Sequence, residues 1–305
     1  MEQIFSSLIP IFSLIVIGYL FKKINFPSNE FWPMADKLTY YVLMPALLII
    51  TLSKAKLDSN DINLIFVSIL AIFLTMILLM IFNKISPIQN SSFTSIVQGG
   101  IRFNTYVFLA LSASIFGDSG LAMAAVIITF AIPILNIFCI TIFALYSQNS
   151  KINFLYLLNS ILRNPLIIAC LMGSLINFSN INIPISIEKL LQILSNAALP
   201  LGLLSIGYTL VLKEIKSSKK DLTISTIAKF LILPITIYLF AKLFELDNSM
   251  ISILVLFAIM PTAPSSFILA RQLNGNLPLM TSIITIQTLL SVLFLAIFVN
   301  YFIYF

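Results

Sequence analysis

Apolar stretches long enough to cross a bilayer alternate with short polar segments along the 305-residue chain. A membrane-spanning helix needs about 20 mostly apolar residues, and on this criterion the pattern predicts ten spans. They cover residues 4–21, 35–53, 62–82, 93–117, 119–147, 153–178, 186–212, 222–243, 250–272 and 277–304. The polar separators are short, as at Lys54–Asp61 and Lys213–Asp221. We therefore expect an all-α integral membrane protein without a long extramembrane domain.

The composition supports this class. Hydrophobic residues make up 60% of the chain and charged residues 9%, and the mean hydropathy is +1.08. A soluble domain has about 45–50% apolar and about 25% charged residues, so this chain could not cover its surface in water. The net charge of +6 says little about nucleic acid, because excess lysine and arginine in membrane proteins usually mark cytoplasmic loops, and we expect no nucleic-acid partner. The expected surroundings are the lipid bilayer.

The placement of the basic residues predicts the orientation. With the N-terminus outside, nine of them fall in inward loops and four in outward loops. The inward set is Lys22, Lys23, Lys84, Lys151, Lys213, Lys216, Lys219, Lys220 and Arg271, and the outward set is Lys54, Lys56, Lys189 and Lys242. The first apolar run has its charges after it and no cleavage-site pattern, which indicates a retained span. We expect a multi-pass protein of the plasma or inner membrane with both termini extracytoplasmic.

Several chemistries are missing from the sequence. The chain has no histidine, so H-E-x-x-H metal sites, Ser/His dyads and histidine-ligated haem cannot form. Cys139 and Cys170 lie in apolar runs and are expected to be small packing residues. No nucleotide-binding motif is visible. We therefore expect no metal, no cofactor and no enzymatic activity, and transport driven by a gradient.

A weak internal repeat divides the ten spans into halves. Three residues of the first and second spans recur at an offset of 155 in the sixth and seventh. Pro10, Gly18 and Pro45 correspond to Pro165, Gly173 and Pro200. Because five spans is an odd number, the two halves must be inverted in the membrane. Inverted repeats are typical of secondary transporters, whose site lies where broken helices meet. We expect two inverted five-helix repeats, residues 1–147 and 148–305.

The ninth span predicts one such break. Pro261 and Pro264 each remove a backbone donor, so carbonyl groups near Met260–Ala263 must find other partners. In a membrane, irregular backbone persists only where protein buries it or where it lines a cavity. Ser265 or Ser266 could cap a second half-helix, whose N-terminal end favours an anion. The alternative is a proline kink without a ligand.

The fourth span, partner of the ninth in the repeat, contains Gly99-Gly100 followed by Arg102 and Asn104. On an unbroken helix four polar residues share one face. They are Gln98, Arg102, Thr105 and Ser112. Asn104 points elsewhere, so either the two polar groups have different neighbours or the helix is distorted around residues 103–105. Arg102 could snorkel to the interface, whereas Asn104 is too short and requires a protein partner or a ligand.

Other polar or proline positions are candidates of lower weight. Asn136 in the fifth span could add an amide to the same cavity, and Asn196 and Ser205 flank a proline of the seventh span, with Pro45 in the matching place of the second. These residues could equally serve close helix packing. Lys229, about two turns into the eighth span, is expected to snorkel.

At these positions the chain resembles the auxin efflux carrier family, which joins plant PIN auxin carriers to bacterial malate- and malonate-permease-like proteins. The resemblance spans nearly the whole chain. Its motifs are Met44-Pro45-Ala46, Arg102-x-Asn104-Thr105, Pro133-x-x-Asn136, Asn164-Pro165, Ala198-Leu199-Pro200-Leu201-Gly202 with Ser205-x-Gly207, and Pro261-x-x-Pro264 leading to Ala270-Arg271. It implies two inverted five-helix repeats in which the broken fourth and ninth helices cross, and it implies that Asn104 and Thr105 contact a substrate carboxylate.

The resulting hypothesis is a secondary transporter of a small organic anion, such as a dicarboxylate or an auxin-like carboxylate, that works by alternating access. The candidate substrate-binding residues are Asn104, Thr105, Arg102, Pro45, Asn136, Asn196, Ser205, Pro261, Thr262, Ala263, Pro264 and Ser265. The alternatives are a sodium-coupled symporter of the bile-acid-transporter type and a membrane sensor that moves no solute. A proton-coupled carrier would usually have a carboxylate in mid-membrane, whereas all eleven acids lie at or near span ends, so sodium symport or uncoupled uniport fits at least as well as proton coupling. Assembly into a homodimer stays open.

Overall fold

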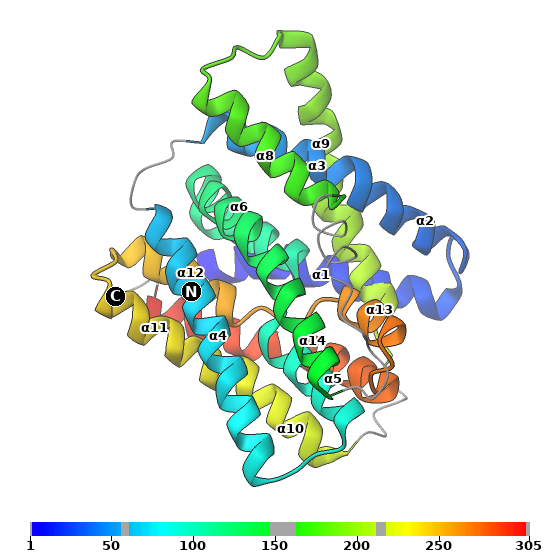
Figure 1. Cartoon of the computed structure of the whole chain (residues 1–305). Coiled ribbons are helices and arrows are strands. Elements are labelled where there is room, and N and C mark those ends of the chain that lie inside the picture. The colour runs from blue at the N-terminus through cyan, green and yellow to red at the C-terminus, as the bar shows by residue number, and fades with distance from the viewer. Residues whose placement is uncertain (1, 56–60, 147–162, 212–217, 303–305) are drawn as a thin grey trace. The chain divides into compact units, whose positions relative to one another are not determined.

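The computed structural model describes residues 2–55, 61–146, 163–211 and 218–302 (Figure 1), and in these ranges all regular secondary structure is helical. The helices are α1 (Glu2–Ile24), α2 (Phe31–Leu38), the π-helical turn η1 (Thr39–Leu43), α3 (Met44–Lys54), α4 (Asp61–Ile85), α5 (Asn90–Ile101), α6 (Thr105–Tyr146), α8 (Pro165–Phe178), α9 (Ile185–Thr209), α10 (Lys219–Ile227), the π-helical turn η3 (Ala228–Ile232), α11 (Leu233–Leu243), α12 (Asn248–Ala258), α13 (Ser265–Gln272) and α14 (Leu277–Phe302).

Within the described residues, six helical stretches are long and apolar enough to cross a membrane. They are Phe31–Lys54, Ile62–Ile85, Asn90–Tyr146, Ile185–Thr209, Lys219–Leu243 and Leu277–Phe298. Large apolar side chains are widely exposed, for example Leu239 at 61% and Leu293 at 58%, as a lipid-facing surface requires. The all-helical membrane class is confirmed. The count of ten spans, their inversion and the orientation stay predictions, and Lys56, Lys151, Lys213, Lys216 and the start of the sixth predicted span lie outside the described residues.

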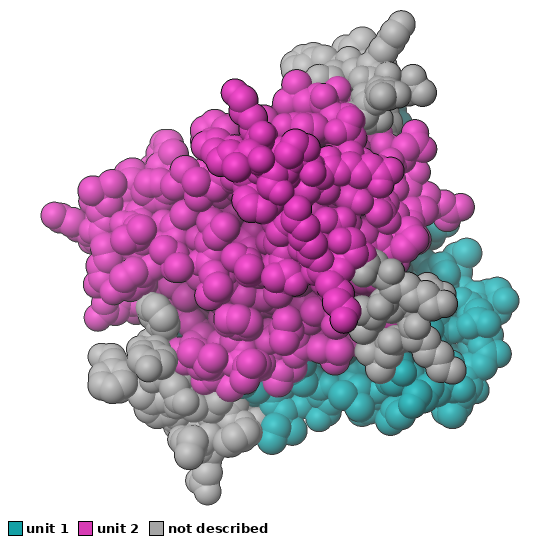
Figure 2. All heavy atoms as spheres, turned by 90° about the horizontal axis from the view of Figure 1, so that it is seen from below, with its two compact units in different colours: residues 1–61, 105–132, 158–209 teal, residues 62–104, 133–157, 210–305 magenta. Residues whose placement is uncertain are grey.

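The chain divides into two compact units that interleave along the sequence (Figure 2). Unit 1 comprises residues 1–61, 105–132 and 158–209, and unit 2 comprises residues 62–104, 133–157 and 210–305. Each unit takes residues from both predicted repeats. The division therefore follows packing rather than the order of the repeats.

In unit 1, α1 packs on α9, and α3 packs on both α8 and α9. The α1–α9 contact depends on two glycines. A Cβ atom on Gly18 would lie 1.9 Å from the carbonyl oxygen of Leu204, and one on Gly207 would lie 1.9 Å from that of Ile15. Small residues allow membrane helices to bring their backbones together. Gly18, which the sequence repeat singled out, therefore has a packing role.

Replacing Gly18 by alanine should destabilise unit 1, because the added methyl group cannot fit beside the Leu204 carbonyl. Overpacking of this kind costs about 1–3 kcal/mol, so we expect the apparent melting temperature of the detergent-solubilised protein to fall. The control is Val16→Ala on the exposed side of the same helix, where Val16 is 55% exposed. Equal melting temperatures for the two variants would contradict this packing.

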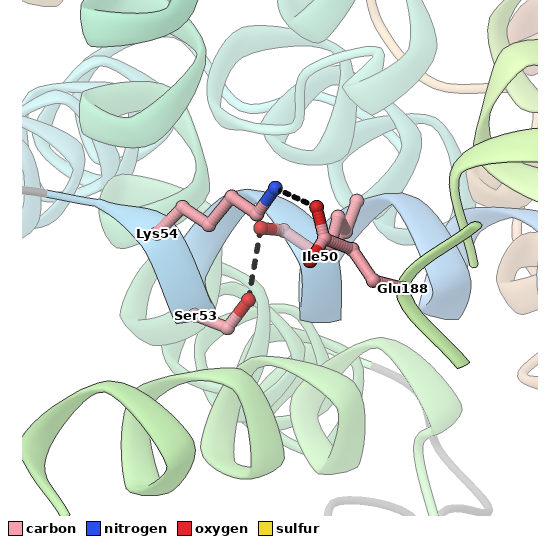
Figure 3. Close-up of polar contacts among 4 residues, drawn as sticks. All are labelled: Ile50, Ser53, Lys54 and Glu188. Atoms are coloured by element: carbon pink, nitrogen blue, oxygen red, sulfur yellow. Dashed lines mark hydrogen bonds and ion pairs between the residues drawn. The ribbon is translucent and has the colours of Figure 1, made fainter. Parts of the chain in front are cut away.

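One end of α3 is held by side chains from α8 and α9. Asn177 Nδ2 donates to the carbonyl oxygens of Leu52 at 2.9 Å and Ala55 at 2.7 Å, which supplies donors to the last carbonyls of α3. Lys54 forms an ion pair with Glu188 near the start of α9 (Figure 3). This pair is exposed and adds little stability. The end of α3 is therefore held mainly by Asn177.

The π-helical turns η1 and η3 each lie shortly before a proline. Pro45 follows η1 by two residues, and Pro234 follows η3 by two residues. A proline ring lacks an N–H and clashes with the carbonyl group four residues earlier, and a widened turn at this place accommodates it. Pro45 is thus accounted for by the local geometry of the second span.

Unit 2 is organised around α5. A Cβ atom on Gly99 would lie 2.1 Å from Ser225 Oγ, and one on Gly100 would lie 3.0 Å from Ala228 Cβ, so the two glycines let α5 pack closely against α10 and η3. The helix stays regular through both glycines and ends at Ile101. The glycine pair of the fourth predicted span therefore serves packing, and the interruption follows it.

Candidate functional site

Two helix interruptions contact each other in unit 2. The first lies between α5 and α6 at residues 102–104, and the second lies between α12 and α13 at residues 259–264. The backbone N–H of Asn104 donates to the carbonyl oxygen of Pro261 at 2.8 Å. The break predicted from Pro261 and Pro264 is confirmed, as is the distortion predicted near residues 103–105. The sequence repeat had paired these two spans.

The second interruption is fixed by a glutamine of α14. Thr262 N–H donates to Gln287 Oε1 at 3.0 Å, and Thr262 Oγ1 donates to the Gly99 carbonyl oxygen at 2.8 Å. The same carbonyl accepts from Gln287 Nε2 at 3.0 Å. Thr262 and Gln287 are both 0% exposed. Backbone groups that leave a helix in a membrane need such partners, so these bonds hold α5, the second interruption and α14 together.

Arg102 bridges the two interruptions and the second half of α6. Its Nη1 donates to Asn136 Oδ1 at 3.1 Å, and its Nη2 donates to Ser265 Oγ at 3.2 Å. The snorkelling considered for Arg102 is not seen, because the guanidinium group turns toward these partners. Both partners are uncharged, and across the residues that the structure describes Arg102 has no ion pair. Its positive charge is therefore available to an anion.

Ser265 begins α13, and Pro264 occupies the N-cap position without a side-chain cap. The capping role predicted for Ser265 or Ser266 is therefore wrong: Pro264 places both serines inside the first turn, where Ser265 accepts from Arg102. The first backbone N–H groups of a helix carry partial positive charge. This helix end lies next to the guanidinium group, so both features favour a carboxylate.

Two buried side chains beside the interruptions lack hydrogen bonds within the described part of the chain. They are the Gln98 amide, one turn before Arg102 on α5, and the Ser266 hydroxyl in the first turn of α13. Both residues are 0% exposed. Buried polar groups are rarely left without a partner, and an exception calls for an explanation such as an absent ligand or water. These side chains extend the polar character of the site.

The candidate residues from the sequence separate into two groups. Unit 2 brings six of them into the hydrogen-bonded cluster or its backbone: Arg102, Asn104, Asn136, Pro261, Thr262 and Ser265. Asn104 is 1% exposed. Ala263 and Pro264 complete the second interruption and are half-buried, and Thr105 is the first residue of α6 and belongs to unit 1.

The remaining candidates lie in unit 1 and have local partners. Ser205 Oγ donates to the Asp36 carboxylate. Asn196 is exposed, and its Oδ1 accepts from Gln192 Nε2 at 3.2 Å on the same helix. Pro45 follows the π-helical turn η1. Each of these residues is accounted for by helix geometry or by a contact within unit 1, as the packing alternative expected.

Gln287 was not among the sequence candidates, although its signal was present. It stands in the segment Thr285-Ile286-Gln287-Thr288-Leu289, inside the mostly apolar tenth predicted span. A buried amide there is as costly as that of Asn104 and needs partners in the same way. Its role depends on where residues 99 and 262 lie, which the local sequence does not indicate.

The chain is similar to known membrane transporters over nearly its full length. A family model described as "Membrane transport protein" matches residues 3–299. A protein of Rhizobium meliloti (strain 1021) named "Putative malonate transporter" is 24% identical over 308 residues, covering 96% of this chain and 93% of that protein. An uncharacterized transporter of Methanocaldococcus jannaschii is 22% identical over 300 residues, covering 93% of this chain and 94% of that protein.

Proposed function

The chain belongs to the membrane transport protein family, which includes the auxin efflux carriers, and on that premise we propose that it is a secondary transporter of short organic dicarboxylates such as malonate. This family match confirms the resemblance seen in the sequence. The family is one of non-enzymatic transporters. The substrate carboxylate would bind at the contact between the two interruptions, and alternating access would expose this contact to each side in turn.

The observation that carries the proposal is the setting of Arg102. Its hydrogen-bond partners Asn136 and Ser265 are uncharged. Arg102 is half-buried in a predicted membrane span, where a charge is costly unless it is paired, and a carboxylate forms short, strong bonds with a guanidinium group. A substrate anion would provide the missing negative charge.

A second positive feature supports a dicarboxylate over a neutral solute. The N-terminal end of α13 begins at Ser265, the residue that Arg102 contacts. The dipole of a helix places about half a positive charge at this end. A guanidinium group and a helix end side by side suit a ligand with two negative charges. The relative named "Putative malonate transporter" points to the same class of substrate.

Counterflow in proteoliposomes tests this function. Vesicles preloaded with unlabelled malonate are placed in labelled malonate, succinate, acetate or indole-3-acetate, with and without sodium. We expect uptake of labelled malonate, and we expect dicarboxylates to inhibit this uptake more strongly than monocarboxylates do. Uptake only with sodium would favour the sodium-symporter alternative. Malonate binding without counterflow would favour a sensor, and if no carboxylate binds, the proposed substrate class is wrong.

Replacing Asn104 by alanine should weaken malonate binding. Asn104 is 1% exposed and stands directly at the contact between the interruptions. A hydrogen bond to a charged group contributes about 1.5–3 kcal/mol, so the apparent KM in counterflow should rise roughly 10- to 100-fold. The matched control is Asn248→Ala at the exposed start of α12. An unchanged KM in Asn104→Ala would refute this site while leaving the family intact.

A further inference from the structure

Lys229 is a buried lysine in the eighth predicted span that the proposed site does not use. It lies in the π-helical turn η3 and is 0% exposed. Ile227 and Leu231, two residues to either side, are 44% and 48% exposed, so Lys229 lies on the opposite, inward face of the helix. The expectation that Lys229 snorkels is therefore wrong, because its stem points into the packed interior of unit 2.

The Nζ atom of Lys229 has no hydrogen-bond partner among the described residues. The helices α5, α10 and α11 pack against η3, and α14 reaches it through the stacked rings of Phe230 and Phe294. The described parts of α5 and of α14 up to residue 298 contain no charged or titratable side chain. The charged or titratable side chains of α10 are Lys219, Lys220 and Asp221, and those of α11 are Tyr238 and Lys242. Lys84 lies at the exposed end of α4.

None of these groups is placed to pair with Lys229. Asp221, the one carboxylate among them, precedes Lys229 by eight residues, which is about 12 Å along a helix axis. Lys84 and Lys242 are exposed near the ends of their helices, and Tyr238 is 40% exposed. An ammonium group buried without an acceptor is strongly unfavourable. Burial without an acceptor therefore favours the neutral amine over the ammonium group.

Lys229 lies one helical turn from the hydrogen-bonded cluster that joins the two interruptions. Ser225, four residues earlier on the same face, donates to the Ile96 carbonyl oxygen at 3.3 Å. Gln287 Nε2 lies 3.5 Å from both oxygen atoms of Ser225, and Gln287 also binds Thr262. Single π-helical turns inside α-helices are frequent at functional sites. The amine is thus coupled structurally to the proposed substrate site.

We propose that Lys229 is the proton-binding site of the carrier, neutral when the substrate site is empty and protonated when a dicarboxylate occupies it. The amine takes a proton from the aqueous side that is open, forms an ammonium group while the dianion is bound, and returns the proton to water on the other side when the dianion leaves. This inference rests on the proposed function. It makes the carrier a proton–dicarboxylate symporter.

The test is proton uptake on malonate binding. Calorimetric titration of the purified, detergent-solubilised protein in two buffers of different ionisation enthalpy gives the number of protons taken up per malonate bound. By linkage, a group that is protonated on binding contributes up to about one proton. We expect this uptake in the wild-type protein and in the control Lys84→Met, and its loss in Lys229→Met and Lys229→Gln, which still bind malonate.

Each other outcome overturns the assignment. Proton uptake that persists in both Lys229 variants places the proton elsewhere. Complete loss of malonate binding in both variants, when they are monodisperse and folded, makes Lys229 a direct ligand rather than a proton carrier. If the wild-type protein binds no malonate, the proposed substrate is wrong and the proton assignment fails with it. If the wild-type protein binds malonate without taking up a proton, the proton assignment alone is wrong.

Discussion

Replacing Arg102 by glutamine should raise the apparent KM for malonate counterflow roughly 30- to 4000-fold, because truncating one partner of a hydrogen-bonded charge pair costs about 2–5 kcal/mol. Glutamine is polar but shorter and uncharged, and it cannot donate to Asn136 and Ser265 while also binding a carboxylate. The effect should fall on KM more than on the amount of folded protein. Steady-state counterflow with labelled malonate measures it.

Two further variants separate charge from geometry. Arg102→Lys keeps the charge but loses the planar fork that reaches two partners at once, so we expect an intermediate KM. Arg271→Gln removes an exposed arginine at the end of α13 and should leave KM unchanged. A wild-type KM in Arg102→Gln would show that the guanidinium group only anchors the helices.

Gln287→Leu should have the largest effect on stability. Leucine is close to glutamine in size, but it leaves the Thr262 N–H without its acceptor and removes one donor from the Gly99 carbonyl. An unsatisfied buried polar group costs about 1–3 kcal/mol. We expect a lower apparent melting temperature in detergent and little remaining counterflow, because the second interruption loses its attachment to α14.

The comparison variants for this prediction are Gln287→Glu and Gln272→Leu. Glutamate can still accept from Thr262 N–H but, when ionised, cannot donate to the Gly99 carbonyl, and its charge is buried. It should therefore destabilise at least as much as leucine at neutral pH. Gln272 is exposed at the end of α13, so its replacement should not change the melting temperature. A stable, active Gln287→Leu protein would refute the proposed role of these bonds.

The ninth-span break was predictable because its cause is local. A proline has no N–H wherever it stands, so Pro261 and Pro264 predict an interruption whichever residues pack around them. The cost of Arg102 and Asn104 in an apolar run is equally local. Both features were found in the sequence, and the structure has an interruption at each place.

The partners of these residues were not predictable from the sequence. Ser265 was expected to cap α13 and instead accepts from Arg102, which lies 163 residues away along the chain. Gln287 is bonded to Thr262 and Gly99, which lie 25 and 188 residues away along the chain. Such bonds depend on which helices pack together, and one residue type can satisfy its hydrogen bonds in many places.

The sequence by itself determined the membrane class, the resemblance to a transporter family and the position of the break at Pro261 and Pro264. These properties follow from hydrophobicity summed over a span and from backbone chemistry fixed by a single residue type. Only the tertiary structure decided that Lys229 is buried rather than at the interface and that Arg102 faces uncharged partners. Burial and pairing are set by contacts between helices far apart in sequence, such as the packing of Gly99 and Gly100 on α5 against α10 and the turn η3 that contains Lys229.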